Sequence, residues 1–225
     1  MQKIWYVIII AAATLSLAAA SFAEHQEIEP NPEIASLIIL KNDYVKPEHS
    51  KGFISETVSP YFQYHGWLGV GGDFTSQPGN KNYLEAKPYL TVNSGPYYAL
   101  LGYSTNSAGN DYVQAGAWYL NRFGKIAVFA DVRNYFAVDG KSSDYLDAFG
   151  EATYDLSRKV AAGVNAEYMH WWKGAEHNLY FIGPVVYYKL TKVTTIYGRV
   201  SREWNVIGSA NEPTNRFRLG LKFSY

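Results

Sequence analysis

Long segments of this chain alternate strictly between apolar and polar side chains, and their charged residues fall on one parity. In residues 142–155, Ala148 and Ala152 alternate with Asp147 and Glu151. Successive side chains of a β-strand point to opposite faces, so such a segment has one charged face and one apolar face. A helix would spread the same residues around its axis. The pattern therefore predicts an all-β protein.

Twelve such segments recur, separated by residues that favour turns. We predict antiparallel strands at 34–45, 52–64, 66–76, 81–93, 96–105, 110–121, 124–137, 142–155, 159–171, 177–190, 193–206 and 214–225. Tight connections such as "NSGP" alternate with longer polar ones such as "KPEHSKG". Because 34–45 alternates poorly, ten strands remain the alternative to twelve. Pro88 and Pro184 fall inside strands, where each removes a ladder hydrogen bond, so we expect bulges or kinks there.

Strand length and the apolar face favour a membrane barrel over a soluble β-protein. Each predicted strand has about ten to fourteen residues, enough to cross a bilayer when tilted. The apolar face is rich in alanine and glycine, and its rings, including Tyr119, Tyr154 and Tyr168, lie near strand ends. Girdles of aromatic residues flank the lipid-facing band of outer-membrane barrels. We therefore predict an antiparallel transmembrane β-barrel over residues 34–225.

The N-terminus has the pattern of a secretory signal peptide. Residues 1–23 carry one charge, Lys3, then an apolar run, and end in the small-x-small sequence "SFA". We expect cleavage there and export of the chain, with an uncleaved membrane anchor as the alternative. Residues 24–33 are acidic and contain two prolines, which predicts a periplasmic linker. No later apolar stretch is long enough for a transmembrane helix.

Composition excludes several classes of function. The 20 Lys and Arg residues balance 20 Asp and Glu residues, which argues against a nucleic-acid-binding protein that relies on bulk charge. Cysteine is absent, which excludes disulfides, thiolate metal sites and a cysteine nucleophile. We find no metal-ligand spacing and no phosphate-binding glycine loop. The sequence therefore predicts neither a metal nor a cofactor.

The last strand carries the resemblance to a known class. Its alternating apolar residues end in an aromatic side chain: Phe217, Leu219, Leu221, Phe223 and Tyr225. With the signal peptide and the alternating strands, this resembles Gram-negative outer-membrane β-barrel proteins. The resemblance implies that these five residues are a signal read by the barrel-assembly machinery, which would be a partner during biogenesis. Size and strand number are similar to those of small monomeric porins of the oligogalacturonate-specific type. That type has a strongly basic lumen, whereas this sequence predicts a mixed one.

The alternation of side chains along each predicted strand places one set of charged residues in the lumen. We predict that these line a pore: Glu85, Lys87, Asp131, Arg133, Asp147, Glu151, Glu167, Arg199, Arg218 and Lys222. A twelve-stranded barrel is wide enough for a narrow channel. Facing acids and bases would orient small hydrophilic solutes, such as sugars or organic acids, and set charge preference. We expect the three arginines to face Glu85, Asp147 and Glu151 at the constriction.

Two other functions remain open. The lumen charges would neutralise one another in a plugged structural or adhesin-like barrel, embedded in outer-membrane lipid as part of a larger envelope complex. In this reading Arg133 and Asp147 are cross-strand neighbours. The second alternative is an outer-membrane lipid hydrolase. Counting through the "DLSRK" turn makes Asp144 the cross-strand neighbour of His170, with Ser142 one step further outward, so these three residues would share one outer patch. No motif surrounds these three residues, and His170 also suits the aromatic girdle, so we predict no catalytic residue and no enzyme activity.

Overall fold

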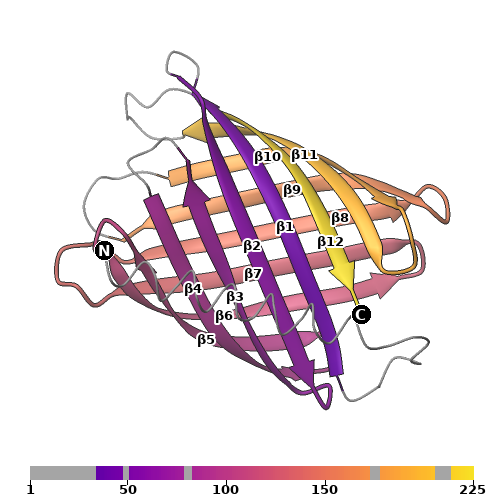
Figure 1. Ribbon diagram of the computed structural model, residues 1–225, viewed down its shortest axis with the longest axis horizontal. Helices are drawn as coiled ribbons and strands as arrows, with labels where there is room; N and C mark the ends of the chain where they lie inside the picture. The colour runs from indigo at the N-terminus through magenta and orange to yellow at the C-terminus, as the bar shows by residue number, and fades with distance from the viewer. Residues whose placement is uncertain (1–33, 48–50, 79–82, 173–177, 206–213) are drawn as a thin grey trace.

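The computed structural model describes residues 34–47, 51–78, 83–172, 178–205 and 214–225, so the predicted signal peptide and linker lie outside the described residues. Twelve antiparallel strands form a closed barrel in which consecutive strands are neighbours and β1 pairs with β12 (Figure 1). The strands are β1 Ile34–Pro47, β2 Phe53–Tyr64, β3 Leu68–Gln77, β4 Tyr83–Ser94, β5 Tyr97–Asn106, β6 Asp111–Phe123, β7 Ile126–Ala137, β8 Tyr145–Asp155, β9 Val160–Trp171, β10 Asn178–Lys189, β11 Thr194–Asn205 and β12 Thr214–Ser224. The prediction of an all-β barrel with twelve strands is confirmed. The described part of the chain contains no helix long and apolar enough to cross a membrane.

The two faces of the barrel wall differ as the alternation predicts. Large apolar side chains are exposed on the outer face, among them Leu101 at 62% and Leu219 at 63%. Polar side chains are buried inside, including Gln114 at 0% and Thr91 at 1%. A soluble protein buries its apolar face. An apolar outer wall around a polar interior is the arrangement of a barrel surrounded by lipid.

The two ends of the barrel differ in the connections between their strands. Short turns at 65–67, 95–96, 124–125, 156–159 and 190–193 join strands at the end where β1 begins and β12 finishes. We call this the short-turn end. Loops such as 107–110 and 138–144 lie at the opposite end, which we call the loop end. Gly66, Gly95 and Gly124 have positive φ angles in the turns, a conformation that glycine adopts without strain.

The seam between β1 and β12 extends to the last residue of the chain. Tyr44 pairs with Phe217, and Leu40 pairs with Leu221. The backbone N–H of Tyr225 donates to the carbonyl of Ser36 at 2.9 Å, and the N–H of Ser36 donates to Tyr225 at 3.0 Å. The first strand, despite its poor alternation, is therefore held by continuous pairing with both β2 and β12.

The mid-strand prolines interrupt the ladder without shifting it. Pairing of β4 with β5 runs through Ala86↔Thr105 and resumes at Tyr89↔Gly102 in the same register. The β10–β11 pairing is likewise interrupted around Pro184 and resumes in the same register. Of the expected bulges or kinks, the bulges are therefore wrong, because the register is unchanged on both sides of each proline. What the prolines remove is local pairing with one neighbour, as the missing N–H requires.

Buried side-chain amides bind the carbonyls beside these prolines. Gln114 Nε2 donates to the carbonyls of Pro88 at 3.1 Å and Tyr103 at 3.2 Å. Asn165 Nδ2 donates to the carbonyl of Gly183 at 2.9 Å. A Cβ atom at Gly102 would lie 2.5 Å from both the Pro88 oxygen and the Gln114 amide, so glycine leaves the space that the amide needs. These amides supply hydrogen bonds where the ladder is interrupted.

Replacing Asn165 with leucine is expected to lower the free energy of unfolding by about 1–3 kcal/mol, the cost of a buried carbonyl without a donor. The matched control is Asn134→Leu, since Asn134 lies on the outer face of β7 and makes no hydrogen bond from its side chain within the described residues. Leucine there should be neutral or stabilising in lipid. Urea unfolding in lipid vesicles, followed by tryptophan fluorescence, measures both. Equal destabilisation by the two substitutions would contradict the role of Asn165.

Candidate functional site: the barrel lumen

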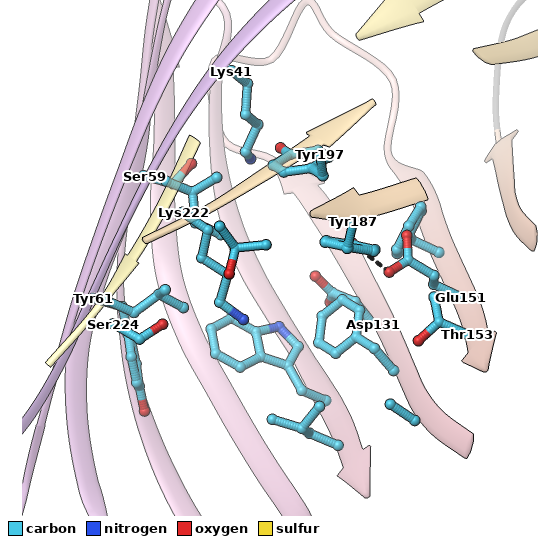
Figure 2. Close-up of a pocket in the computed structure, with 18 of the residues that line it drawn as sticks. Lys41, Ser59, Tyr61, Asp131, Glu151, Thr153, Tyr187, Tyr197, Lys222 and Ser224 are labelled. Atoms are coloured by element: carbon cyan, nitrogen blue, oxygen red, sulfur yellow. Dashed lines mark hydrogen bonds between the residues drawn. The ribbon is translucent and has the colours of Figure 1, made fainter. Parts of the chain in front are cut away.

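The lumen contains a cavity of about 1100 Å³. Its lining begins at the short-turn end with residues such as Leu37 and Ser224, and reaches Lys41, Asp73 and Arg218 near mid-barrel. Figure 2 shows polar side chains from several strands pointing into this space. Among the described residues, none from loops 107–110 or 138–144 lines it. The cavity therefore begins at the short-turn end and extends past mid-barrel to Tyr135 and Asp147 without reaching these loops.

Nine of the ten predicted pore-lining residues lie in the cavity wall. These are Lys87, Asp131, Arg133, Asp147, Glu151, Glu167, Arg199, Arg218 and Lys222. The exception is Glu85, which is absent from the lining and lies 3.1 Å from Lys87 Nζ through its Oε2 atom. Alternation along each strand thus identifies the inward-facing side chains. Their position along the barrel axis determines which of them line the cavity.

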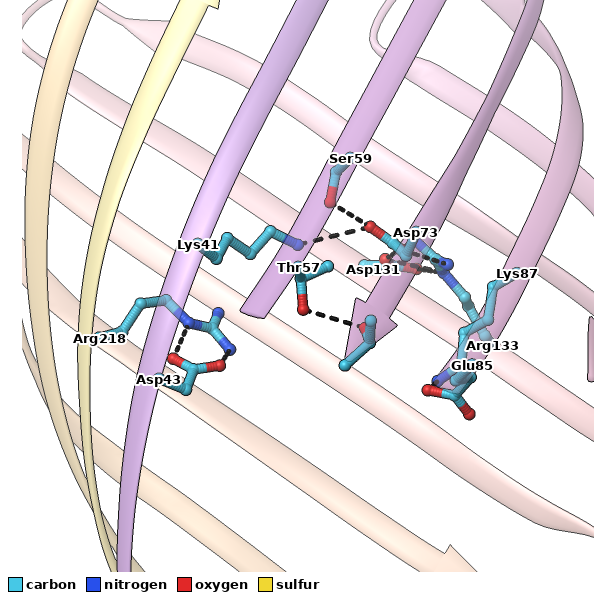
Figure 3. A network of polar contacts seen from close by, with 11 residues as sticks. Lys41, Asp43, Thr57, Ser59, Asp73, Glu85, Lys87, Asp131, Arg133 and Arg218 are labelled. Carbon is cyan, nitrogen blue, oxygen red and sulfur yellow. Dashed lines mark hydrogen bonds and ion pairs between the residues drawn. The ribbon is translucent and has the colours of Figure 1, made fainter. Parts of the chain in front are cut away.

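The centre of the lumen holds a network of charges around Asp73 (Figure 3). The carboxylate of Asp73 lies 3.4 Å from Lys41 Nζ and 3.5 Å from a guanidinium nitrogen of Arg133, and it accepts a hydrogen bond from the Ser59 hydroxyl. Arg133 also binds Asp131, with an N–O distance of 2.7 Å. Because Arg133 is on β7 and Asp73 on β3, this contact joins walls that are not neighbours in the sheet.

Arg133 and Asp147 are cross-strand neighbours, as predicted, but they do not form an ion pair. The register places Arg133 opposite Asp147. The guanidinium instead turns toward Asp131 and Asp73, and it lies 5.2 Å from the ring centroid of Tyr89. The Asp147 Oδ1 atom is buried without a hydrogen-bond partner. The shortest contact of Arg133 is therefore with Asp131 on its own strand, and its second carboxylate partner, Asp73, lies across the lumen.

The other two arginines of the expected constriction also have carboxylate partners. Arg199 pairs with Glu151, which accepts a further hydrogen bond from the Tyr187 hydroxyl at 2.5 Å. Arg218 binds Asp43 in a bidentate manner, at 2.6 and 2.8 Å. Of the facing pairs expected from sequence, only Arg199 with Glu151 is therefore formed.

Lys41 and Asp43 are lumen residues that sequence reasoning missed. Both lie on β1, the segment whose alternation is weakest. A usable signal was present in the final strand, since antiparallel pairing of β12 with β1 puts Asp43 opposite Arg218. Pairing the last predicted strand with the first, as a closed barrel requires, would have identified Asp43 as the partner of Arg218 from the sequence.

Cations without partners gather at the short-turn end. Four exposed residues line the cavity there, and we call them the basic mouth: Arg158, Lys159, Lys189 and Lys192. Within the described residues none of the four forms an ion pair, and neither does Lys222 further in. Among the described residues, the acidic side chain at this level is Asp155, which is paired with Arg122. The predicted mixed lumen is thus balanced at mid-barrel and positive at its short-turn opening.

An aromatic cluster lies at the loop end of strands β6 to β9. Tyr112, Tyr135 and Tyr145 form a buried cluster against which Met169 and Trp171 pack. The rings of Tyr135 and Tyr145 stack with centroids 4.3 Å apart and an interplanar angle of 6°. The cavity reaches Tyr135 and does not continue to Tyr112 or Tyr145. The described cavity therefore ends at this cluster on the β6–β8 side of the barrel.

Comparison with known proteins identifies the fold and gives no match by sequence. No protein-family model and no curated protein matches the chain. The KdgM porin in complex with disordered oligogalacturonate has a TM-score of 0.59 at 12% identity, covering 84% of this chain and 99% of that one. The NanC porin gives 0.59 at 9% identity, covering 83% and 98%. The chain shares the fold of these porins.

The resemblance to the oligogalacturonate type of porin is therefore confirmed at the level of the fold. A third solved structure, the translocator domain of the autotransporter NalP from Neisseria meningitidis, has a TM-score of 0.53 at 12% identity and covers 96% of each chain. Barrels of one architecture thus serve proteins of different kinds, so function has to be argued from the lumen of this chain.

The proposed hydrolase triad is not assembled. The register places His170 opposite Leu146 and not opposite Asp144, so the expected position was wrong by two residues. The Asp144 carboxylate accepts a hydrogen bond from the backbone N–H of Ala137. The Ser142 hydroxyl donates to Asp139 at 2.6 Å, and His170 packs against the rings of Tyr168 and Trp172. His170 thus lies among aromatic rings, as the girdle interpretation expects.

Asp139 orders the loop that contains Ser142. Its carboxylate accepts bonds from the Ser142 hydroxyl at 2.6 Å and from the backbone N–H groups of Ser142 and Lys141, both at 2.8 Å. The hydroxyl bond is the largest cause, followed by the backbone bonds, of a pKa held well below the usual carboxyl range. A carboxylate with a lowered pKa stabilises this loop at pH values above its usual pKa, and this contribution is lost as the pH falls through the lowered value.

The loop is accordingly expected to keep its hydrogen bonds at the usual carboxyl pKa of about 3.9 and to lose them only at lower pH. The chemical shift of the Ser142 amide, followed by NMR in detergent micelles, should therefore stay constant as the pH falls through the usual carboxyl pKa. It should change only at lower pH. Asp139→Asn is the control and should remove the transition. A midpoint at the usual carboxyl pKa would contradict the assignment.

Proposed function

We propose that this protein is a porin-like channel of the Gram-negative outer membrane, through which small hydrophilic solutes diffuse passively. The observation that carries the proposal is the charged lumen cavity of about 1100 Å³ inside a wall whose outer face is apolar. Water and ions are stable in such a space, while the wall is stable in lipid. The porin fold of KdgM and NanC supports the same function.

Location and biogenesis follow from the ends of the chain. The signal sequence in residues 1–23 would direct export and be removed, and outer-membrane lipid would surround the apolar wall. Both described termini lie at the short-turn end, which we assign to the periplasm. The barrel-assembly machinery would read the final strand through Phe217, Leu219, Leu221, Phe223 and Tyr225.

Charge distribution favours anions among the solutes. Each acid at the centre of the Asp73 network has a cationic partner, whereas Lys222 and the basic mouth have none within the described residues. Unpaired cations attract and concentrate small anions in a narrow opening. The oligogalacturonate bound to the KdgM porin supports acidic sugars or organic acids as the solute class. The pore-lining role thus belongs to the nine cavity residues named above.

Planar-bilayer recording of the refolded, purified protein tests the proposal. Discrete conductance steps are expected, and the reversal potential in a potassium chloride gradient should have the sign of anion preference. The heat-unfolded protein is the control for contaminating channels. Absence of steps from folded protein would overturn the channel, and cation preference would overturn the assignment of the basic mouth.

A plugged structural barrel within an envelope assembly is the second candidate. The cross-lumen contact of Arg133 with Asp73 and the buried tyrosine cluster favour it, because both fill space that a wide pore needs. This candidate predicts no conductance from folded protein, together with altered envelope integrity when the gene is deleted. For enzyme activity, the dispersal of Ser142, Asp144 and His170 supports a non-catalytic barrel.

A further inference from the structure

Part of the cavity wall is apolar and faces the lumen. Trp118 and Leu120 lie on the inward face of β6, Phe129 on β7 and Phe149 on β8, and all four line the cavity. We call these four residues the apolar arc. The register pairs Leu120 with Phe129, and the ring centroids of Phe129 and Phe149 lie 5.9 Å apart. The apolar arc is therefore one continuous surface.

The exposure of Leu120 shows that this surface is accessible from the cavity. Leu120 is 52% exposed although its side chain lines the lumen. Lipid surrounds the exposed leucines of the outer face, whereas the lumen offers Leu120 water. Apolar surface that is exposed to water has a cost in free energy, which a bound apolar group removes. The apolar arc therefore favours a ligand with an apolar body.

Packing holds the indole of Trp118 in place. The ring centroids of Tyr61 and Tyr98 lie 5.7 and 6.0 Å from that of Trp118, and the Arg133 guanidinium lies over the indole at 5.4 Å. Aromatic and cation–π contacts of this kind favour one ring orientation. A ligand therefore meets a surface that is already ordered, and its binding loses little free energy to rearrangement.

A cation lies on the wall opposite the apolar arc. Lys222 is on β12, six strands from β6 in a closed barrel of twelve, and it lines the same cavity. Figure 2 shows its side chain pointing into this space. Within the described residues Lys222 forms no ion pair, and its cross-strand neighbours, Ile39 and Thr195, carry no charge. An ammonium group in such surroundings favours an anionic ligand.

We propose that the cavity binds an aromatic carboxylate, with its ring on the apolar arc and its carboxylate at Lys222. An acidic sugar fits less well, because its hydroxyls would lose water against Leu120 and Phe129. The cavity of about 1100 Å³ is slightly larger than the usual ligand pocket of about 300–1,000 Å³, so it holds such a ligand together with water. Binding follows from this geometry alone, while transport of the ligand rests on the proposed channel function.

Competition measured by fluorine NMR tests the binding in the folded, purified barrel. The probe is 4-fluorobenzoate, the competitors are benzoate, galacturonate and benzyl alcohol, and micelles without protein give the background. Benzoate should compete about fivefold more strongly than galacturonate, whose hydroxyls lose hydration on the apolar arc. It should compete about tenfold more strongly than benzyl alcohol, which lacks the charge-assisted contact. Competition by galacturonate or benzyl alcohol as strong as that by benzoate would overturn the proposal.

Two substitutions locate the ligand in the cavity. Leu120→Gln removes apolar surface with little change in size and should weaken binding of 4-fluorobenzoate about fivefold. Lys222→Gln should weaken it about tenfold. The matched controls are Leu156→Gln and Lys125→Gln, since both residues are exposed in turns at the short-turn end and neither lines the cavity. These two should bind the probe as the native chain does.

Heat-modifiable electrophoretic mobility checks that each variant is folded. Native affinity in both cavity variants would overturn the site. Should Leu120→Gln not fold, the affinity of Lys222→Gln and the order of the three competitors still decide the proposal.

Conductance then connects binding to transport. Benzoate added to a chloride solution should lower the current of the native chain about twofold, because a bound ligand occupies the path of the ions, and should lower that of Leu120→Gln less. Unchanged current, together with binding by NMR, would overturn the role in transport and leave the binding site established. If the native chain does not conduct, the channel function fails, and the competition experiment still decides whether the cavity binds the ligand.

Discussion

Asp73→Asn is expected to destabilise the barrel by about 3 kcal/mol, the loss that follows when one member of a partly buried ion network is removed. The carboxylate of Asp73 lies between Lys41 and Arg133 and accepts the Ser59 hydroxyl bond. Asparagine would leave both cations facing each other across the lumen. The variant should also shift the reversal potential further toward anions, because the network gains net positive charge.

The matched control for this substitution is Asp155→Asn. Asp155 pairs with Arg122, whose side chain is 56% exposed, at the short-turn end. An exposed pair of this kind contributes less than about 1 kcal/mol. Urea unfolding should therefore distinguish the two variants. Equal losses of stability would show that the Asp73 network is as well solvated as the basic mouth. An unchanged reversal potential in Asp73→Asn would show that the Asp73 network does not lie on the path of the ions.

Deletion of Tyr225 is expected to reduce the amount of assembled barrel in the outer membrane about tenfold. The deletion removes two backbone hydrogen bonds with Ser36, which together stabilise the seam by about 2 kcal/mol. It also removes the terminal aromatic side chain. Heat-modifiable electrophoretic mobility of outer-membrane fractions measures the folded population.

Two comparisons separate seam stability from recognition by the assembly machinery. Tyr154→Ala removes an equally exposed ring at the same end of the barrel, from a strand away from the seam, and should have little effect. Refolding of the truncated chain into lipid vesicles should be impaired less than its assembly in cells. Equal losses in cells and in vesicles would mean that the final strand acts through the seam alone.

The strands and their faces could be read from the sequence because a period of two is a local property. Asp147 and Glu151 face the lumen whatever the rest of the chain does, provided that their strand forms. The same reasoning explains the error at His170. A miscount of two residues in the β8–β9 turn leaves every side chain on its correct face and moves it along the strand by about 7 Å.

Ion pairing inside the lumen depends on the closed barrel and was therefore harder to predict. Arg133 reaches Asp73 on a distant strand in preference to its neighbour Asp147. Long, flexible side chains in a narrow lumen can choose among several partners, and the choice depends on barrel tilt and shear. The role of the Asn165 amide could not be predicted from the sequence, because it depends on a gap in the ladder that appears only when β10 is paired with β11.

The uneven fixed charge along the lumen has an electrical consequence for the proposed channel. Cations that form no ion pair within the described residues line the cavity at the short-turn end, whereas a buried aromatic cluster lies at the loop end. Anions driven in one direction would accumulate at the positive end, whereas anions driven in the other would be depleted there. A channel with this charge distribution would rectify: its current at one polarity would exceed that at the other. The orientation of the barrel in the membrane would thus set the preferred direction of flow.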